Sequence, residues 1–173
     1  MTRLVSIIII CLFGLSPTGP ALAQAVLPQG VAPIEFGQDT MVITTDQGRY
    51  VYDVEVAVTK KQQARGMMWR PVLGPNKGMI FILETERNLS FWMRNTLIPL
   101  DMVFIDNAGK LVSIQRDATP LSKVPLPSGG PARIVLEIDG GDAAILNIND
   151  STRFEFGSAT LNYLAASRLP FKG

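Results

Sequence analysis

Histidine is absent from the 173-residue chain, and cysteine occurs only once, at Cys11. Cys11 lies in an apolar N-terminal stretch that we expect to be cleaved, so the mature domain should contain neither residue. These absences exclude disulfides, thiolate nucleophiles, serine chemistry assisted by histidine, and the usual zinc sites. Catalysis would therefore have to use carboxylates, Lys, Tyr, Ser, Thr or a bound cofactor.

An excess of charge of either sign is also missing. The chain has 16 basic and 15 acidic residues, and Arg3 alone supplies the excess. A balanced chain exerts no global attraction on nucleic acid or on an anionic membrane, so we expect no nucleic-acid partner, and a local charged patch is the alternative. With 47% hydrophobic residues, the composition is that of a folded domain rather than a disordered chain.

The first 23 residues have the pattern of a signal peptide. A short basic start ends at Arg3, an apolar run covers residues 4–15, and Ala21-Leu22-Ala23 fits the small-x-small cleavage pattern. The apolar run is too short to span a bilayer comfortably. We therefore expect cleavage after Ala23, a periplasmic or secreted protein, and no integral membrane span afterwards. The alternative is an uncleaved membrane anchor.

The remaining sequence favours β-structure. Residues 50–58 alternate with a period of two, which is typical of a half-buried strand, and residues 106–109 predict a tight turn between two strands. Strands are expected at 41–45, 50–58, 79–83, 89–94, 100–105, 110–115, 132–138 and 153–156. Residues 117–131, with four prolines and two glycines in Pro120–Pro131, predict a long irregular loop.

Only short helices are predicted. Thr59 and Gln62 form a capping-box pattern for a helix over 60–65 that Gly66 closes, and Asp142 is expected to cap a second helix over 143–147. The tail 159–173 predicts at most a turn of helix. Such helices cannot provide the crossovers of a doubly wound α/β fold.

The fold prediction is therefore a mainly β, single-domain sandwich or partly closed, jelly-roll-like barrel with two short helices. The domain is expected over 39–157, after a flexible lead-in at 24–38 and before a C-terminal tail at 158–173.

Four sequence segments carry a family resemblance. They are Arg-Gly-Met-Met at 65–68, Gly-Met-Ile-Phe at 78–81, SFWMRNTLIPLDMVFID at 90–106 and VLEIDGG at 135–141. Together they resemble the family called domain of unknown function, number 192, over about residues 50–157. The resemblance implies a mainly β, jelly-roll-like domain that is often exported in bacteria, and it implies no activity. Ser151-Thr152 stands where members commonly have Gly-Asp, which argues against a role for a carboxylate at that turn.

A cluster of polar and aromatic residues follows the expected strand at 89–94. Along a strand, Trp92 and Arg94 share one face and could stack against a sugar ring or another planar group. Asn95 and Thr96 add hydrogen-bonding groups at the strand end. In the structural alternative, Trp92 is part of the core, Arg94 pairs with a carboxylate, and Asn95 shapes a turn. The candidate ligand-binding residues are Arg65, Trp92, Arg94, Asn95, Thr96 and Asp101.

Two acids, Asp101 and Glu137, interrupt apolar strands. Burying an unpaired charge is unfavourable, so each acid should be paired or should line a cavity. Arg65 and Arg94 are possible partners of Asp101 in a pair that holds the sheet. If Asp101 and Glu137 faced each other in one cleft, they could act as an acid–base pair, and they are the only catalytic candidates.

Methionine is the only metal-binding residue type that clusters in the sequence. Thioethers can bind Cu(I) in exported proteins, but without histidine or cysteine such a site would be weak, and methionine is a common core residue. The clustered methionines are Met67, Met68, Met79, Met93 and Met102. We predict neither a metal nor a cofactor.

Three functions are compatible with these observations. The first is a binding module for an envelope ligand (a glycan, a peptide or a protein), which would use the loops at 65–69, 92–96 and 120–131. The second is a carboxylate-dependent hydrolase of cell-envelope sugar polymers. The third is a purely structural envelope protein without a pocket.

Overall fold

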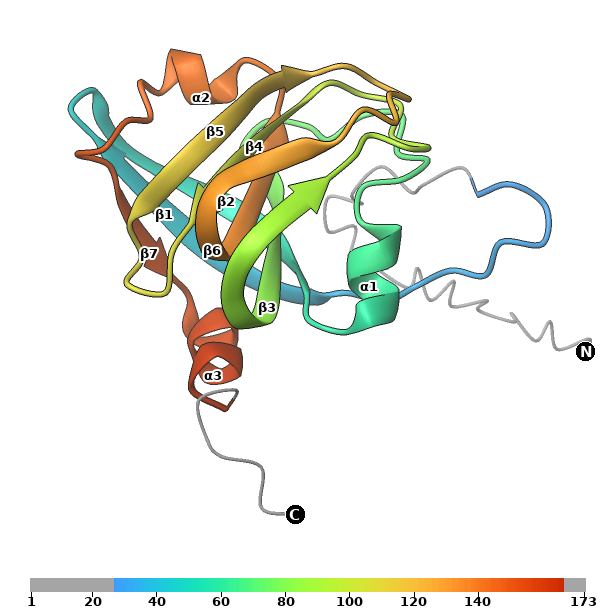
Figure 1. Ribbon diagram of the computed structural model, residues 1–173, viewed down its shortest axis with the longest axis horizontal. Helices are drawn as coiled ribbons and strands as arrows, with labels where there is room; N and C mark the ends of the chain where they lie inside the picture. Colours follow the sequence, from blue (N-terminus) through green and yellow to red (C-terminus); the bar gives the residue numbers. More distant parts are fainter. Residues whose placement is uncertain (1–26, 167–173) are drawn as a thin grey trace, which may run out of the picture.

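The computed structural model describes residues 27–166, so the expected signal peptide and the end of the tail lie outside the described residues. The chain forms seven strands and three short helices (Figure 1). In chain order they are β1 (Gly37–Thr45), β2 (Gly48–Ala57), α1 (Lys60–Arg65), β3 (Lys77–Phe91), β4 (Leu100–Ile105), β5 (Leu111–Ala118), β6 (Leu126–Asp139), α2 (Asp142–Ile145), β7 (Arg153–Phe156) and α3 (Ser158–Ala166).

All seven strands belong to one curled sheet with the order β5-β4-β6-β3-β2-β1-β7. Neighbouring strands are antiparallel except β2 and β3, which are parallel and joined through α1. The prediction of a mainly β, partly closed barrel is confirmed. A single sheet replaces the two layers of a sandwich, and α3 is a third helix where only a turn was expected.

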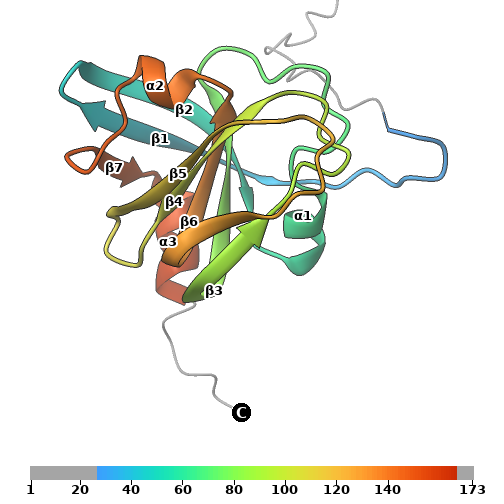
Figure 2. The same ribbon diagram turned by 45° about the horizontal axis from the view of Figure 1, so that its top comes forward.

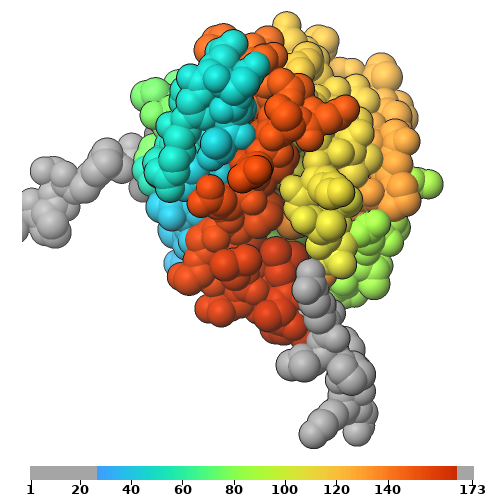
Figure 3. Space-filling view, turned by 90° about the vertical axis from the view of Figure 1, so that its left-hand side faces the viewer, coloured from blue at the N-terminus to red at the C-terminus, as the bar shows by residue number. Residues whose placement is uncertain are grey.

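The sheet curls around an inner core. Both edge strands contribute to it, since Ile114 of β5 and Phe154 of β7 pack in one cluster with Met41, Ile43 and Tyr52. In the space-filling view of Figure 3, the segment from α2 to α3 lies between the β1–β2 hairpin and β5.

Two polar contacts fix that segment in place. Asn147 donates from Nδ2 to the Asp46 carboxylate at 2.9 and 3.0 Å, and Arg116 donates from Nη2 to the Ile148 carbonyl at 3.2 Å. Asp46 lies between β1 and β2, and Arg116 lies on β5. The segment from α2 to α3 therefore connects the β1–β2 hairpin with strand β5 at the other side of the sheet.

A second, outer core covers the other face of the sheet. It takes the alternate residues of the same central strands, among them Phe81, Phe104 and Val135, together with Met67 and Met93 from the covering loops. Because both faces of β4 and of the second half of β6 are covered, β4 and residues 132–138 are buried at every position and are mostly apolar. Helix α1 lies over the outer face, away from α2 (Figure 2).

The lead-in packs against α1. Gln62 donates from Nε2 to the Glu35 carbonyl at 2.9 Å, and Arg65 donates from Nη2 to the Ala32 carbonyl at 2.8 Å. Phe36 is partly buried against the outer core. Residues 32–36 are therefore part of the domain surface that surrounds α1.

Three predicted strands, which correspond to β3 and β6, had wrong boundaries. The two strands expected at 79–83 and 89–94 are one strand, β3, whose register with β6 shifts after Ile82 and again after Asn88. Strand β6 begins at Leu126, inside the loop expected at 117–131, and its prolines at 127 and 131 pair near these shifts. A missing amide is tolerated where the ladder is already irregular.

Candidate functional site

A cavity of about 270 Å³ lies between α1 and the outer face of the sheet, and we call it the outer cavity. Its wall includes apolar side chains from three separate parts of the chain, among them Met67 and Met68 after α1, Phe81 and Phe91 of β3, and Trp92. Glu137 is the only acidic residue in the lining, while Arg65 and Arg87 are basic. The cavity thus combines an apolar wall with a few polar groups.

Local sequence builds the α1 side of this cavity. Gln62 donates from its backbone amide to Thr59 Oγ1 at 3.2 Å, and the Thr59 amide donates to Gln62 Oε1 at 2.9 Å. This capping box and the closure of the helix at Gly66 are as predicted. Gly66 has a φ of 46°, and a Cβ at that position would lie 3.2 Å from Cζ of Phe81.

Gly66→Ala should therefore destabilise the domain by about 1–3 kcal/mol, because it combines left-handed backbone strain with crowding of Phe81. Urea denaturation measures the loss. The matched control is Gly109→Ala, where φ is 80° and no atom lies within 4 Å of the position that a Cβ would take. A loss no larger than that of the control would contradict the role of the contact with Phe81.

Glu137 is a buried polar group in this lining. In the sheet it lies opposite Met79 of β3 and Met102 of β4, and its side chain is only 4% exposed. Its Oε2 atom is buried and accepts no hydrogen bond from any described residue. Burial raises the pKa of Glu137 to about 8, although the nearby positive charge of Arg70 opposes the shift. At neutral pH the carboxyl is mostly protonated and can donate a hydrogen bond.

Arg70 does not neutralise Glu137. Its Nη2 pairs with Glu55, which is opposite Met79 on the far side from Glu137. The buried Nε of Arg70 has no hydrogen-bond partner within the described residues. Among the described residues, Arg70 thus forms an ion pair with Glu55 and none with Glu137, whose side chain lines the cavity without an ion-pair partner.

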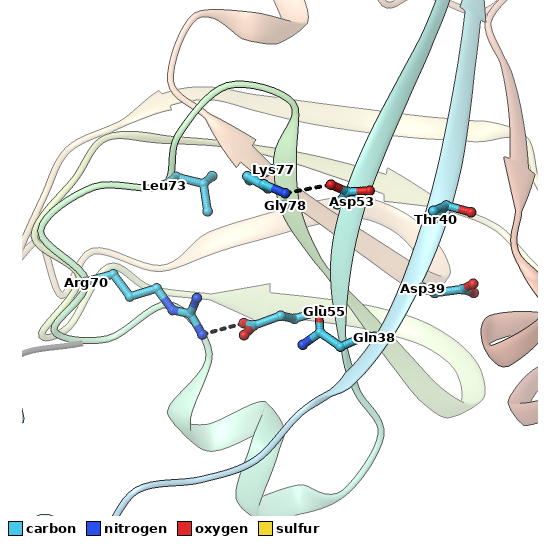
Figure 4. Close-up of a pocket in the computed structure, with 9 residues that line it drawn as sticks. All are labelled: Gln38, Asp39, Thr40, Asp53, Glu55, Arg70, Leu73, Lys77 and Gly78. Carbon is cyan, nitrogen blue, oxygen red and sulfur yellow. Dashed lines mark hydrogen bonds and ion pairs between the residues drawn. The ribbon is translucent and has the colours of Figure 1, made fainter. Parts of the chain in front are cut away.

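A second, larger pocket of about 430 Å³ lies beside β1 and β2 (Figure 4). Its charged groups already form ion pairs with one another: Arg70 pairs with Glu55, and Lys77 Nζ lies 2.5 Å from Asp53 Oδ2. Asp39, which points away from these pairs, accepts a hydrogen bond from the Thr160 amide of α3 at 2.8 Å. These contacts hold the strands and α3, so the outer cavity is the better candidate site.

Three of the six predicted ligand-binding residues line the outer cavity. They are Arg65, Trp92 and Thr96. Trp92 is 55% exposed, so it is not a core residue, whereas Thr96 is buried. The guanidinium of Arg65 lies 5.0 Å from the ring centre of Trp69.

Arg94 and Asn95 are outside the lining. Strand β3 ends at Phe91, so the alternation that placed Trp92 and Arg94 on one face does not continue to them. Arg94 is exposed. Asn95 has a φ of 60° and lies with its Nδ2 3.7 Å from the sulfur of Met68, so it positions the loop, as in the structural alternative.

Asp101 is buried as a structural residue. Its Oδ1 accepts from the Asp117 amide at 2.6 Å, and its Oδ2 accepts from the amides of Gly141 and Ala143 at 3.1 and 2.7 Å. Asp101 therefore caps the start of α2, a role expected of Asp142, and its partners are not the arginines that were predicted. Asp142 instead accepts a hydrogen bond from the Tyr52 hydroxyl at 2.8 Å.

Asp101 and Glu137 do not face each other in one cleft, which was the condition for an acid–base pair. Asp101 lies opposite Ile138, while Glu137 lies opposite Met102. Successive residues of a strand point to opposite faces of the sheet. The two carboxyls are therefore on different sides of the sheet and cannot act on one substrate atom.

Tertiary hydrogen bonds that no local sequence pattern indicates connect the loops around the cavity. The Trp69 amide donates to the Asn95 carbonyl at 2.8 Å, and the Leu121 amide donates to the Thr96 carbonyl at 3.0 Å. Trp69, Asn95 and Leu121 all have φ near +60°. This left-handed conformation is strained for Trp and Leu. Each of the three strained or left-handed residues lies in a different loop, and these three loops meet beside the cavity.

Neither a cluster of metal ligands nor a membrane-spanning helix occurs in the part of the chain that the structure describes. No group of three or more acidic, cysteine or histidine side chains is placed to hold a metal ion in residues 27–166. Within the same range no helix has the length and hydropathy needed to cross a bilayer.

The fold and the outer cavity define a small, curled β-domain with a cavity of about 270 Å³ on its outer face. Residues 41–156 match the family described as uncharacterised ACR, domain of unknown function 192, and the chain belongs to this family. The resemblance seen in the sequence is thus confirmed.

Two solved structures are similar. One, a protein of unknown function from Novosphingobium aromaticivorans, is 38% identical with a TM-score of 0.67, and the match covers 79% of this chain and 99% of that one. The other, from Sinorhizobium meliloti, is described as a candidate transcription regulator. It is 31% identical with a TM-score of 0.69, over 72% of this chain and 98% of that one. No curated protein matches the chain.

Proposed function

We propose that the protein is a binding module whose outer cavity holds one end of a small ligand or one unit of a larger one. The observation that carries this proposal is the buried, unpartnered Oε2 of Glu137 in the lining. A buried polar atom without a partner costs about 1–3 kcal/mol. A ligand acceptor that hydrogen-bonds to the Glu137 carboxyl would reduce that penalty, which would give binding a physical driving force.

The size of the cavity sets the size of the bound group. Sites for drug-sized molecules are roughly 300–1,000 Å³, whereas this cavity is about 270 Å³. It fits one ring or one side chain rather than an oligomer. Trp92, half exposed beside the cavity, offers a surface for the rest of a glycan or peptide.

The other candidate functions have less support. A two-carboxylate hydrolase needs a second acid, yet Glu137 is the only acid in the lining. A purely structural role does not explain why a cavity lies beside an unpartnered carboxyl. The Sinorhizobium description suggests nucleic acid as a partner, but the balanced charge of this chain does not favour it. Action outside the cytoplasm is part of our proposal and rests on the N-terminal pattern.

Intrinsic tryptophan fluorescence can test the proposal, because Trp92 lines the cavity and Trp69 contacts Arg65. The probes are phenylacetate, 2-phenylacetamide and 2-phenylethylamine, which share one ring and differ in charge. We expect saturable binding of at least one probe to the native protein. Ser90→Phe, which fills the cavity from β3, should reduce its affinity at least tenfold.

The matched control is Thr85→Phe, at an exposed position of the same strand that is outside the lining. It should leave the affinity unchanged. Binding that survives Ser90→Phe, or failure of all three probes to saturate, would overturn the proposal.

A further inference from the structure

The charges of the outer cavity indicate which ligands it accepts. Among its lining residues, Arg65 and Arg87 carry positive charge and Glu137 is the only acid. Arg87 is exposed, and no described residue forms an ion pair or a side-chain hydrogen bond with it. Arg65 uses one N–H for the Ala32 carbonyl and retains other donors of its guanidinium. Both arginines can therefore meet an incoming anion.

Glu137 would cancel part of this positive charge only if it were ionised. Burial holds its pKa at about 8, so at pH 7 the group presents a proton rather than a charge. A protonated carboxyl is a donor to an anionic oxygen, whereas an ionised one repels it. The protonated form thus adds a third donor to the two guanidinium groups.

We infer that the outer cavity selects a small anionic ligand with an apolar body, bound by Arg65 and Arg87 and by the protonated carboxyl of Glu137. The inference rests on the proposed function and names its ligand class. The apolar body lies against Met67, Phe81 and Phe91, and the anionic oxygens accept the polar donors. Small carboxylates with a ring or a branched chain fit this description.

The pH dependence follows from the charged groups around Glu137. Arg70, which pairs with Glu55 of β2, is the charged group that acts on the Glu137 carboxyl. Arg65 and Arg87 line the same cavity, and Asp139 is two residues away on β6. Burial, together with the nearby charge of Asp142, raises the pKa of Asp139 above its ordinary value. Histidine is absent from the chain, so no imidazole titrates in this range.

The test compares the three probes at pH 7 and pH 9 by tryptophan fluorescence. At pH 7 we expect phenylacetate to bind more tightly than 2-phenylacetamide, and 2-phenylethylamine to bind most weakly. With a pKa of about 8, the protonated fraction of Glu137 falls about tenfold between these pH values. The apparent affinity for phenylacetate should fall by about the same factor.

Three variants separate the contributions. Arg87→Gln should lower the affinity for phenylacetate several-fold and leave that for 2-phenylacetamide unchanged. Arg94→Gln, which replaces an exposed arginine outside the lining, should alter neither. Glu137→Gln keeps a donor but does not titrate, so it should abolish the loss of phenylacetate affinity between pH 7 and pH 9.

The outcomes distinguish the inference from the proposed function. Equal, pH-independent binding of phenylacetate and 2-phenylacetamide would overturn the inference, but it would agree with the proposal that the protein is a binding module. Tightest binding of 2-phenylethylamine, strengthening from pH 7 to pH 9, would also overturn it and assign a cationic ligand. Absence of saturable binding by all three probes would overturn both.

Discussion

Replacing Asp101 with alanine should destabilise the domain by about 3 kcal/mol or more, a large part of the roughly 5–15 kcal/mol by which ordinary domains are stable. The side chain is fully buried, and its two oxygens accept hydrogen bonds from the amides of Asp117, Gly141 and Ala143. Alanine would leave three backbone donors without this partner, and the buried amide of Ala143 alone would cost about 1–3 kcal/mol if water does not enter. Denaturation in urea measures the loss.

Two further variants make the result interpretable. Asp53→Ala removes an exposed carboxylate that pairs with Lys77, and it should cost less than about 1 kcal/mol. Asp101→Asn keeps one acceptor but places an amide donor beside backbone donors, so its loss should be intermediate. A melting temperature of Asp101→Ala equal to that of the native protein would refute the capping role.

The second large effect is a pH dependence of stability that comes from Glu137. Its pKa is about 8 in the folded protein and 4.5 as the ordinary value. Between these values the folded protein binds one more proton than the unfolded chain, so the free energy of unfolding falls as pH rises. The contribution is complete below about pH 4.5, declines by at most about 1.4 kcal/mol per pH unit, and is lost above pH 8.

Urea denaturation at intervals from pH 4.5 to pH 9 measures this decline relative to Glu137→Gln, which cannot titrate. The exposed acid Glu84 of β3 provides the control, since Glu84→Gln should leave the native pH profile unaltered. Parallel profiles for the native protein and Glu137→Gln would show that Glu137 titrates normally. Glu137→Met, which matches its neighbours Met79 and Met102, should be more stable than the native protein at pH 8.

The elements that local sequence determines were predicted well. Helix α1 follows from Thr59, Gln62 and Gly66, which lie within eight residues of one another, and the turn at 106–109 follows from its own residue types. The boundaries of β3 and β6 were wrong because they depend on pairing across the sheet. In the local sequence, the polar residues at 84–88 and the two prolines look like the ends of strands. In the folded protein, register shifts between β3 and β6 accommodate them.

The site was predicted in part for the same reason. An acid in an apolar strand must be paired or line a cavity, and this argument applied to both Asp101 and Glu137. The sequence could not separate them, because the partners of Asp101 are backbone amides, which nearly every residue possesses. Trp92 and Thr96 were found through their side-chain types, but the arrangement of the loops at Trp69 and Leu121 depends on tertiary hydrogen bonds.

The C-terminal segment that joins β5 to the β1–β2 hairpin has a consequence for biosynthesis. Strand β7 pairs with the edge of β1, and Asn147 and Ile148 make the connecting contacts, so these parts are synthesised after the other six strands. Until then β1 presents an unpaired edge to other nascent chains, a common start of aggregation. The sheet is therefore complete only once β7 has been synthesised, and a chaperone that shields the open edge would raise the yield of folded protein.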